Sequence, residues 1–150
     1  MIRCLSAALI AAVSFCSVGG QEIATNLLAA RTALRAGNAE AALAAADALL
    51  RIADDDPRAI MMAADVYLRC DRPEQSIPLY DRYIEAHPES MPRLWQRGIA
   101  LYFAGKYRQG AEQFVKHRAV NPHDVENAAW HFLCVAKAES FDTARQSVLP

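Results

Sequence analysis

Residues of one size class recur along this chain at a fixed spacing of 34 positions. Small side chains fill two of the recurring sets and turn-prone residues dominate a third; another set runs from alanine to aromatic residues, and the last is a pair of prolines. The sets are Ala30, Ala64 and Gly98; Ala42, Ser76, Gly110 and Ala144; Ala46, Tyr80 and Phe114; Gly37, Asp71, Gly105 and Glu139; and Pro88 with Pro122. A fixed period with matched residue sizes predicts an array of repeated units that bury their apolar faces against one another.

Each unit has the apolar spacing of a pair of helices. In PRLWQRGIALYFAG, residues 92–105, apolar or small residues return every three or four positions, as on one face of a helix. Gly105 should end this helix, because glycine tolerates the left-handed conformation of a C-cap. A second helix is expected over about residues 106–120, and Asn121 before Pro122 should stop it.

Capping residues and composition agree with an all-helical chain. Asp124 is placed to cap the helix after Pro122, and Asp56 is placed to cap one that starts at Pro57. Alanine is abundant while glycine and proline are few, which favours helix over sheet. The fold class predicted from the residues is therefore all-α.

This constellation resembles the tetratricopeptide repeat family. The segments 57–90 and 91–124 match it best, a weaker alanine-rich unit covers 23–56, and a partial unit begins at Val125. The resemblance implies a right-handed solenoid of antiparallel helix pairs over residues 21–150, with about three full repeats and a partial fourth. Arg97 and His131 stand where the family usually has Leu, and Phe132 replaces a small residue, so the last unit should pack less regularly.

A narrower resemblance concerns the cellular role. The segments WQRGIALYFAGK and NPHDVENAAWHFLCVAK are similar to parts of NlpI-type bacterial lipoproteins and related exported repeat proteins. That resemblance implies a non-catalytic scaffold or adaptor of the bacterial cell envelope. The alternative is a structural subunit of a larger assembly.

The first twenty residues, MIRCLSAALIAAVSFCSVGG, have a basic start, an apolar run and a small-residue end. This order predicts a signal peptide over residues 1–20, cleaved after Gly19 or Gly20, and export to the periplasm or cell envelope. Two alternatives stay open. An uncleaved anchor would have only about fifteen apolar residues where a span needs ~20, and lipid attachment at Cys16 would place the bulky Phe15 before the modified residue. No other stretch is long and apolar enough to cross a membrane.

In the tetratricopeptide family, the first helix of each pair lines a concave groove. Carried over position by position, the groove suits an extended peptide or a partner helix, although Trp95 and Phe103 could equally pack between repeats. The lysine and asparagine set that clamps acidic peptide C-termini in some members is not present. The expected groove residues are Leu27, Arg31, Arg35, Met61, Asp65, Leu68, Arg69, Trp95, Ile99, Tyr102, Phe103, Ala129, Leu133 and Lys137.

No combination of residues predicts catalysis, a metal or a cofactor. His131 and Cys134 lie three apart on one helix, but a nucleophile and base also need an orienting group and an oxyanion site, so a small hydrolase is the least favoured hypothesis. His117 and His123 lack a third metal ligand. The DDD at 54–56 lacks the glycine and distal glutamate of a calcium loop.

The net charge argues against one class of partner, and the cysteine positions argue against a disulfide. The net charge is −1, from 16 Lys and Arg against 17 Asp and Glu, which predicts no nucleic-acid partner. Cys70 and Cys134 should lie on the order of 20 Å apart in a stack whose helices pack ~8–10 Å apart, so we predict two free thiols.

The C-terminal end of the array is expected to be incompletely covered. The second helix of the last unit should begin near Phe141, and only nine residues follow it to Pro150. Repeat arrays usually need a polar terminal helix over their last apolar face. We therefore expect a docking or self-association surface at this end, unless the chain is part of a longer protein.

Overall fold

The computed structural model describes the backbone of residues 6–147 and the side chains of residues 19–147, and within these residues it contains helices and turns but no strand. Cys4, the side chain of Cys16 and the last residues from Val148 on lie outside the described part. The expectations that rest on them, including lipid attachment, stay predictions. The elements are α1 (Ser6–Arg35), α2 (Ala39–Ile52), α3 (Pro57–Arg69), α4 (Pro73–Ala86), the 3₁₀ helix η1 (Pro88–Arg93), α5 (Trp95–Phe103), α6 (Tyr107–Arg118), α7 (Val125–Ala138) and α8 (Phe141–Gln146).

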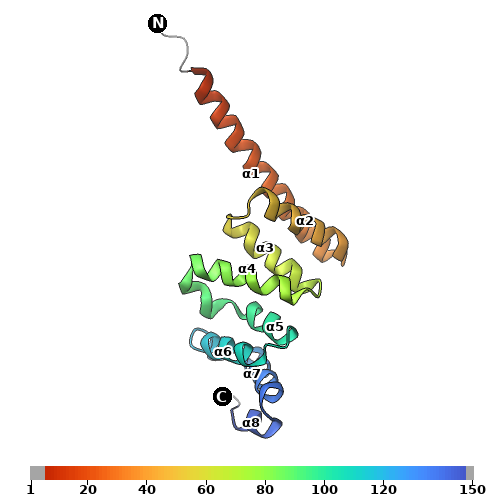
Figure 1. Ribbon diagram of the computed structural model, residues 1–150, viewed down its shortest axis with the longest axis vertical. Helices are drawn as coiled ribbons and strands as arrows, with labels where there is room; N and C mark the ends of the chain where they lie inside the picture. Colours follow the sequence, from red (N-terminus) through yellow and green to blue (C-terminus); the bar gives the residue numbers. More distant parts are fainter. Residues whose placement is uncertain (1–5, 148–150) are drawn as a thin grey trace. The chain divides into compact units, whose positions relative to one another are not determined.

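The first of two compact units extends to Val66 and contains α1, α2 and most of α3. Helices α1 and α2 pack along each other after a turn at residues 36–38, so they run antiparallel (Figure 1). Alanines on both helices are fully buried, which allows this close approach. A core cluster of Leu27, Leu49, Ala53 and Ala59 completes the unit.

The second compact unit starts at Tyr67 and contains the end of α3 together with α4, η1 and α5 to α8. Successive helices pack against each other, α4 on α5, α5 on α6, α6 on α7 and α7 on α8 (Figure 1). Tyr80, Leu101, Phe114 and Cys134 are fully buried between them. The predicted all-helical repeat fold is confirmed.

The 34-residue period is visible in the backbone of three turns. Gly37, Asp71 and Gly105 all have a positive φ, of 67°, 60° and 73°. The residue after each donates its N–H to a carbonyl five positions back, at 2.8–2.9 Å, which is the hydrogen bond of a Schellman C-cap. Glu139 occupies the fourth place, and its φ of −131° shows that the last turn is built differently.

Buried positions repeat in the same register. Ala46, Tyr80 and Phe114 each have 0 % of their surface exposed, although they range from a methyl group to an aromatic ring. The small set is likewise inaccessible, with Ala42, Ser76 and Ala144 at 0 % and Gly110 buried. Positions that share a place in the 34-residue period are therefore buried alike.

The two predicted N-caps are confirmed. Asp56 accepts hydrogen bonds from the backbone N–H of Arg58 at 2.8 Å and from its guanidinium at 2.6 Å, and this guanidinium lowers the pKa of the Asp56 carboxyl to about 2. Asp124 accepts from the backbone N–H of Asn127 at 3.0 Å, which lowers the pKa of Asp124 as well.

The third 34-residue repeat, residues 91–124, begins differently from its neighbours. Residues 88–93 form the 3₁₀ helix η1, and α5 begins only at Trp95. Pro88 and Pro92 explain this delay, because a proline disfavours the α conformation in the residue before it. The short α5 presents its aromatic residues over little more than two turns.

Helix α1 passes through Gly19 and Gly20 without a break, so the backbone alone does not test the predicted cleavage there. In the part of the chain that the structure describes, no helix combines the length and the apolar character that a membrane span requires.

Candidate functional site

The expected groove residues are divided between the two compact units. In the first unit, Arg31 and Arg35 are exposed on α1, and Met61 and Asp65 are half-buried on α3. Leu27 is only 9 % exposed and belongs to the core, so it does not line a groove. In the second unit, Leu68 is half-buried and Arg69 is exposed at the end of α3.

The remaining expected residues gather on α5 and α7. Trp95 is 41 % exposed, Phe103 is 57 % exposed, and Leu133 on α7 is 39 % exposed, and it is their grouping on two neighbouring helices that is informative. We call the surface that they share with their neighbours the aromatic face. It consists of Trp95, Ile99, Tyr102 and Phe103 on α5 and Trp130, Leu133 and Lys137 on α7.

Tyr102 contacts three neighbouring aromatic rings in and beside the aromatic face. Its ring lies 5.5 Å, centroid to centroid, from each of Phe103, Tyr107 and Trp130, always edge to face. Trp130 also lies 6.0 Å from Phe103 and stacks on the buried Phe114 at 6.4 Å. Such ring pairs contribute about 0.5–1.5 kcal/mol each beyond their burial, so the face is pre-formed.

Trp130 is the functional candidate that the sequence did not identify. The family's groove pattern predicted Ala129, which is exposed beside it. The positions equivalent to Trp130 in the three earlier repeats are Gln96, Met62 and Leu28, so the repeat register gave no aromatic signal there. The only sequence signal was the tryptophan itself, three positions from Leu133 on the same helix.

The aromatic face has opposite charges near its two ends. At the start of α7, Asp124 and Glu126 line a small cavity of about 170 Å³ together with Trp95 and Trp130. At the other end, a hollow of about 430 Å³ near Gly105 is lined by Lys106, Arg108 and Lys137 and by no carboxylate. An extended ligand along this face would therefore meet acidic groups at one end and basic groups at the other.

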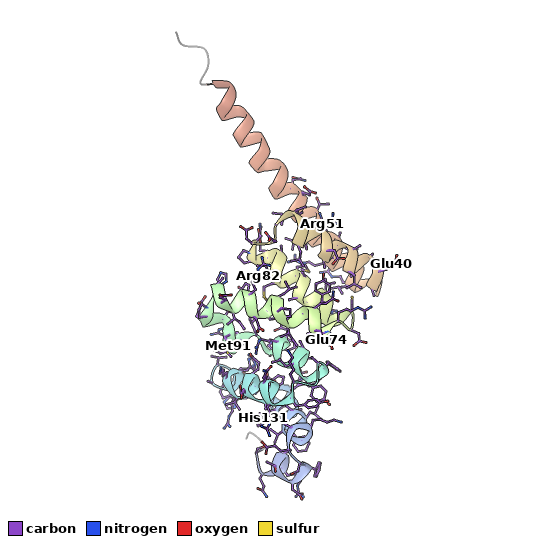
Figure 2. The ribbon with its side chains drawn as sticks, viewed as in Figure 1. Glu40, Arg51, Glu74, Arg82, Met91 and His131 are labelled. Atoms are coloured by element: carbon purple, nitrogen blue, oxygen red, sulfur yellow. The ribbon has the colours of Figure 1, made fainter. Side chains whose placement is uncertain are left out.

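Buried polar side chains fix the helices that carry the face. Gln113 on α6 donates to the carbonyl of Met91 on η1 at 2.8 Å; Figure 2 labels Met91. His117 donates from Nδ1 to the carbonyl of Pro92 at 2.9 Å, and its Nε2 lies 3.3 Å from Asp124. Asn127 on α7 donates to the carbonyl of Phe114 at 3.1 Å.

The surroundings of Cys134 and His131 do not favour nucleophilic chemistry. Cys134 is fully buried, and burial raises the pKa of its thiol to about 12, so it stays protonated at neutral pH. His131 is 6 % exposed, and burial lowers its pKa. No disulfide joins Cys70 to Cys134, as predicted. Among the described residues, no three His, Cys, Asp or Glu side chains are placed to hold a metal ion.

Comparison with known proteins agrees with this architecture. The sequence profile of the tetratricopeptide repeat matches residues 24–97, which include the alanine-rich unit that carries the pattern least clearly. No curated protein and no solved structure gives a significant match. Tetratricopeptide repeats generally mediate protein–protein interaction, and they are typically non-catalytic modules. Residues 24–97 of this chain therefore belong to the tetratricopeptide repeat family.

Proposed function

We propose that this protein is a non-catalytic adaptor that binds a peptide or helix of a partner protein on its aromatic face. The observation that carries the proposal is the exposure of Trp95, Phe103 and Leu133 on the aromatic face. The half-buried rings of Tyr102 and Trp130 contact each other between them. Tryptophan, tyrosine and arginine dominate the energetically important positions of interfaces. A pre-formed apolar face also reduces the entropy that binding must overcome.

The charged ends of the face give the ligand a direction. Lys106, Arg108 and Lys137 favour acidic residues at one end of the bound segment, and Asp124 with Glu126 favours basic residues at the other. Charge complementarity of this kind mainly sets orientation and the rate of association. The preferred ligand is therefore an apolar or aromatic segment between an acidic and a basic flank.

We also propose that the chain acts in the bacterial cell envelope after export. The order of basic, apolar and small residues in positions 1–20 supports this proposal, as does the resemblance to NlpI-type proteins. The N-terminal sequence of the chain recovered from a periplasmic fraction tests it. We expect a start at Gly20 or Gln21, and an intact Met1 would contradict cleavage.

A capture experiment from envelope extracts tests the binding proposal. Leu133→Ser and Phe103→Ser should each weaken retention of the partner, while Val120→Ser serves as the matched control. Val120 and Leu133 are both 39 % exposed, but Val120 follows α6 and lies outside the aromatic face. Equal retention by all three variants would refute the aromatic face as the binding surface, provided that their circular dichroism is unchanged.

A further inference from the structure

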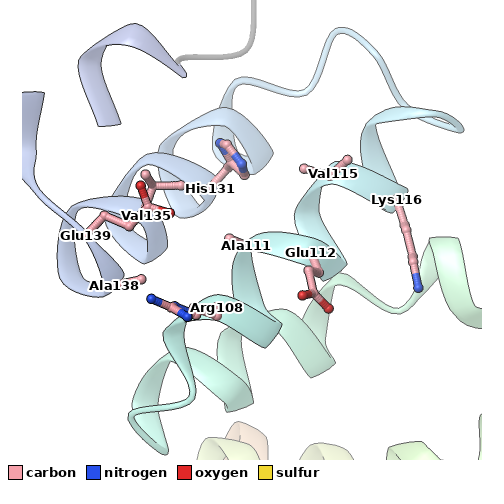
Figure 3. Close-up of a pocket in the computed structure, with 9 residues that line it drawn as sticks. All are labelled: Arg108, Ala111, Glu112, Val115, Lys116, His131, Val135, Ala138 and Glu139. Atoms are coloured by element: carbon pink, nitrogen blue, oxygen red, sulfur yellow. The ribbon is translucent and has the colours of Figure 1, made fainter. Parts of the chain in front are cut away.

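A second surface, distinct from the aromatic face, lies between α6 and α7. It is a groove of about 660 Å³ (Figure 3). Its floor is formed by Ala111 from α6 and by His131, Val135 and Ala138 from α7, and Val115 of α6 lies at its edge. Because a helix turns about 100° per residue, these α7 residues lie on the side of the helix opposite Trp130, Leu133 and Lys137.

One polar atom in the floor lacks a partner. His131 is 6 % exposed, and its Nδ1 atom makes no hydrogen bond with any described residue. Figures 2 and 3 label this side chain on α7. Buried polar groups are nearly always hydrogen-bonded, so an unpaired one that lines an open groove indicates a ligand that supplies the partner.

In the preceding 34-residue repeat, the residue equivalent to His131 makes its polar contacts within the chain. Arg97, which lies 34 positions before His131, donates to Asp81 on α4 at 2.6 Å and to Gln113 on α6 at 3.3 Å. The residue equivalent to Asp81 in the next unit is Val115, which accepts no hydrogen bond through its side chain. The polar contact that closes one junction is therefore missing from the next.

The junction is also lined by smaller side chains. Ala111 stands where the preceding unit has Ile77, and Val135 stands where it has Leu101. Ile77 is only 4 % exposed and Leu101 is fully buried, so these two larger side chains fill the earlier junction. The smaller residues leave the α6–α7 groove open, with Val115 51 % exposed at its edge.

The rim of the groove carries charges at helical spacing. Arg108, Glu112 and Lys116 follow one another every four residues along α6, and Glu139 ends the opposite wall. None of the four forms an ion pair with another residue in the described part of the chain. A bound helix with an acidic, a basic and an acidic residue at four-residue spacing would complement the α6 rim.

We propose that the α6–α7 groove binds an amphipathic helix of a partner protein, with an acidic–basic–acidic edge against Arg108, Glu112 and Lys116 and a polar side chain opposite His131. The apolar side of the helix packs on Ala111, Val115, Val135 and Ala138, as amphipathic helices do in apolar grooves. The polar side chain, a glutamine or a carboxylate, accepts a hydrogen bond from His131 Nδ1. This site lies apart from the aromatic face itself, but it shares Arg108 with the basic hollow at the end of that face.

Two synthetic peptides test the proposal on the full chain. Each is a lactam-bridged helix of about 15 residues, or four turns, with leucine and alanine on its groove side and one central glutamine. The first peptide carries Glu, Lys and Glu along one edge, and the second carries Lys, Glu and Lys. Fluorescence anisotropy of the labelled peptides measures affinity, and the imidazole nitrogen signals of His131 report the new hydrogen bond.

We expect the first peptide to bind about 10-fold more tightly, since partly exposed ion pairs contribute modestly and there are three of them. The charge-reversed variant Arg108→Glu/Glu112→Lys/Lys116→Glu should invert this preference. Its three side chains are exposed, so its fold should be preserved. Ala111→Trp, which fills the floor, should abolish binding of both peptides and the shift of the His131 signals.

Three results would overturn the proposal. These are no binding of either peptide, equal affinity for both, or binding that leaves the His131 signals unchanged. Sedimentation equilibrium of the full chain tests whether a second copy of the chain occupies the groove instead. A concentration-dependent dimer that Ala111→Trp dissociates would assign the groove to a second copy of this chain and not to a partner's helix.

Discussion

Gly98 on α5 lies close against the ring of Phe114 on α6, and adding one methyl group tests this contact. A Cβ atom at Gly98 would lie 2.6 Å from Cζ of Phe114 and 2.9 and 3.0 Å from two further atoms of that ring. The ring is fully buried and stacks on Trp130, so moving it away from the new methyl group would disturb that stack, although the ring also borders the small cavity beside Trp95. Gly98→Ala should therefore force α5 and α6 apart.

Two opposing effects set the size of the change. Replacing a helical glycine by alanine favours the helix by about 0.5–1 kcal/mol. Overpacking a close-packed core costs about 1–3 kcal/mol. The second effect should win here, because the new methyl group meets a fully buried aromatic ring and not the end of a flexible side chain. We expect a net loss of about 1–2 kcal/mol in the free energy of unfolding.

Urea unfolding followed by circular dichroism measures this loss, and a double-mutant cycle identifies its cause. Phe114→Leu alone should be destabilising, because it removes part of a buried ring. Combined with Gly98→Ala, it should be less damaging than the sum of the two, with a coupling of about 1 kcal/mol or more. Additive effects, or a Gly98→Ala variant as stable as the parent, would refute the proposed close packing of α5 on α6.

Three further predictions concern a turn, a cap and a thiol. Gly105→Ala should destabilise the fold by about 1 kcal/mol in urea unfolding, because φ is 73° and no neighbouring atom lies within 4 Å of the added Cβ; Gly105→Asn should lose less. The folded pKa of Asp56, about 2, is below its ordinary value of 3.8, so its charge adds stability above that value, which is lost as pH falls from about 4 toward 2. Asp56→Asn keeps the cap, and thermal unfolding across this pH range should show a weaker dependence than in the parent chain. Iodoacetamide at pH 8 should modify Cys70 before the buried Cys134, as peptide mass spectrometry will show, and rapid modification of Cys134 in the folded chain would revive a nucleophilic role.

The parts of the fold that follow from local chemistry were predictable from the sequence. The turns at Gly37 and Gly105 required a left-handed residue, and the caps at Asp56 and Asp124 required a short acceptor side chain. Each requirement involves only residues close in the chain. The 34-residue period then extended these local predictions to the equivalent positions of every unit.

Features that depend on which helices meet were not predictable in the same way. His117 is an example, since a histidine followed by Arg118 near a helix end gives no sign that its ring reaches Pro92, 25 positions earlier. The aromatic face depends similarly on Trp130 reaching across to Tyr102. The resemblance to the family placed Tyr102 and Phe103 on the proposed binding surface, but it carried no information on a ring that the other units lack.

Departures from the repeat register carry the remaining information. In the third 34-residue repeat, Arg97 donates a hydrogen bond to Asp81, and the absence of a side chain at Gly98 leaves room for the ring of Phe114. The fourth unit has His131 and Phe132 in the same places.

Phe132 finds a partner within the chain, because its ring lies edge-on against Phe141 at 5.5 Å, whereas Nδ1 of His131 has no partner among the described residues. A sequence that only had to pack would agree at every level with its fold, and a position that breaks this agreement without internal compensation indicates a contact supplied from outside. By this reasoning, the irregularity at Phe132 is compensated packing, and the irregularity at His131 indicates a binding site.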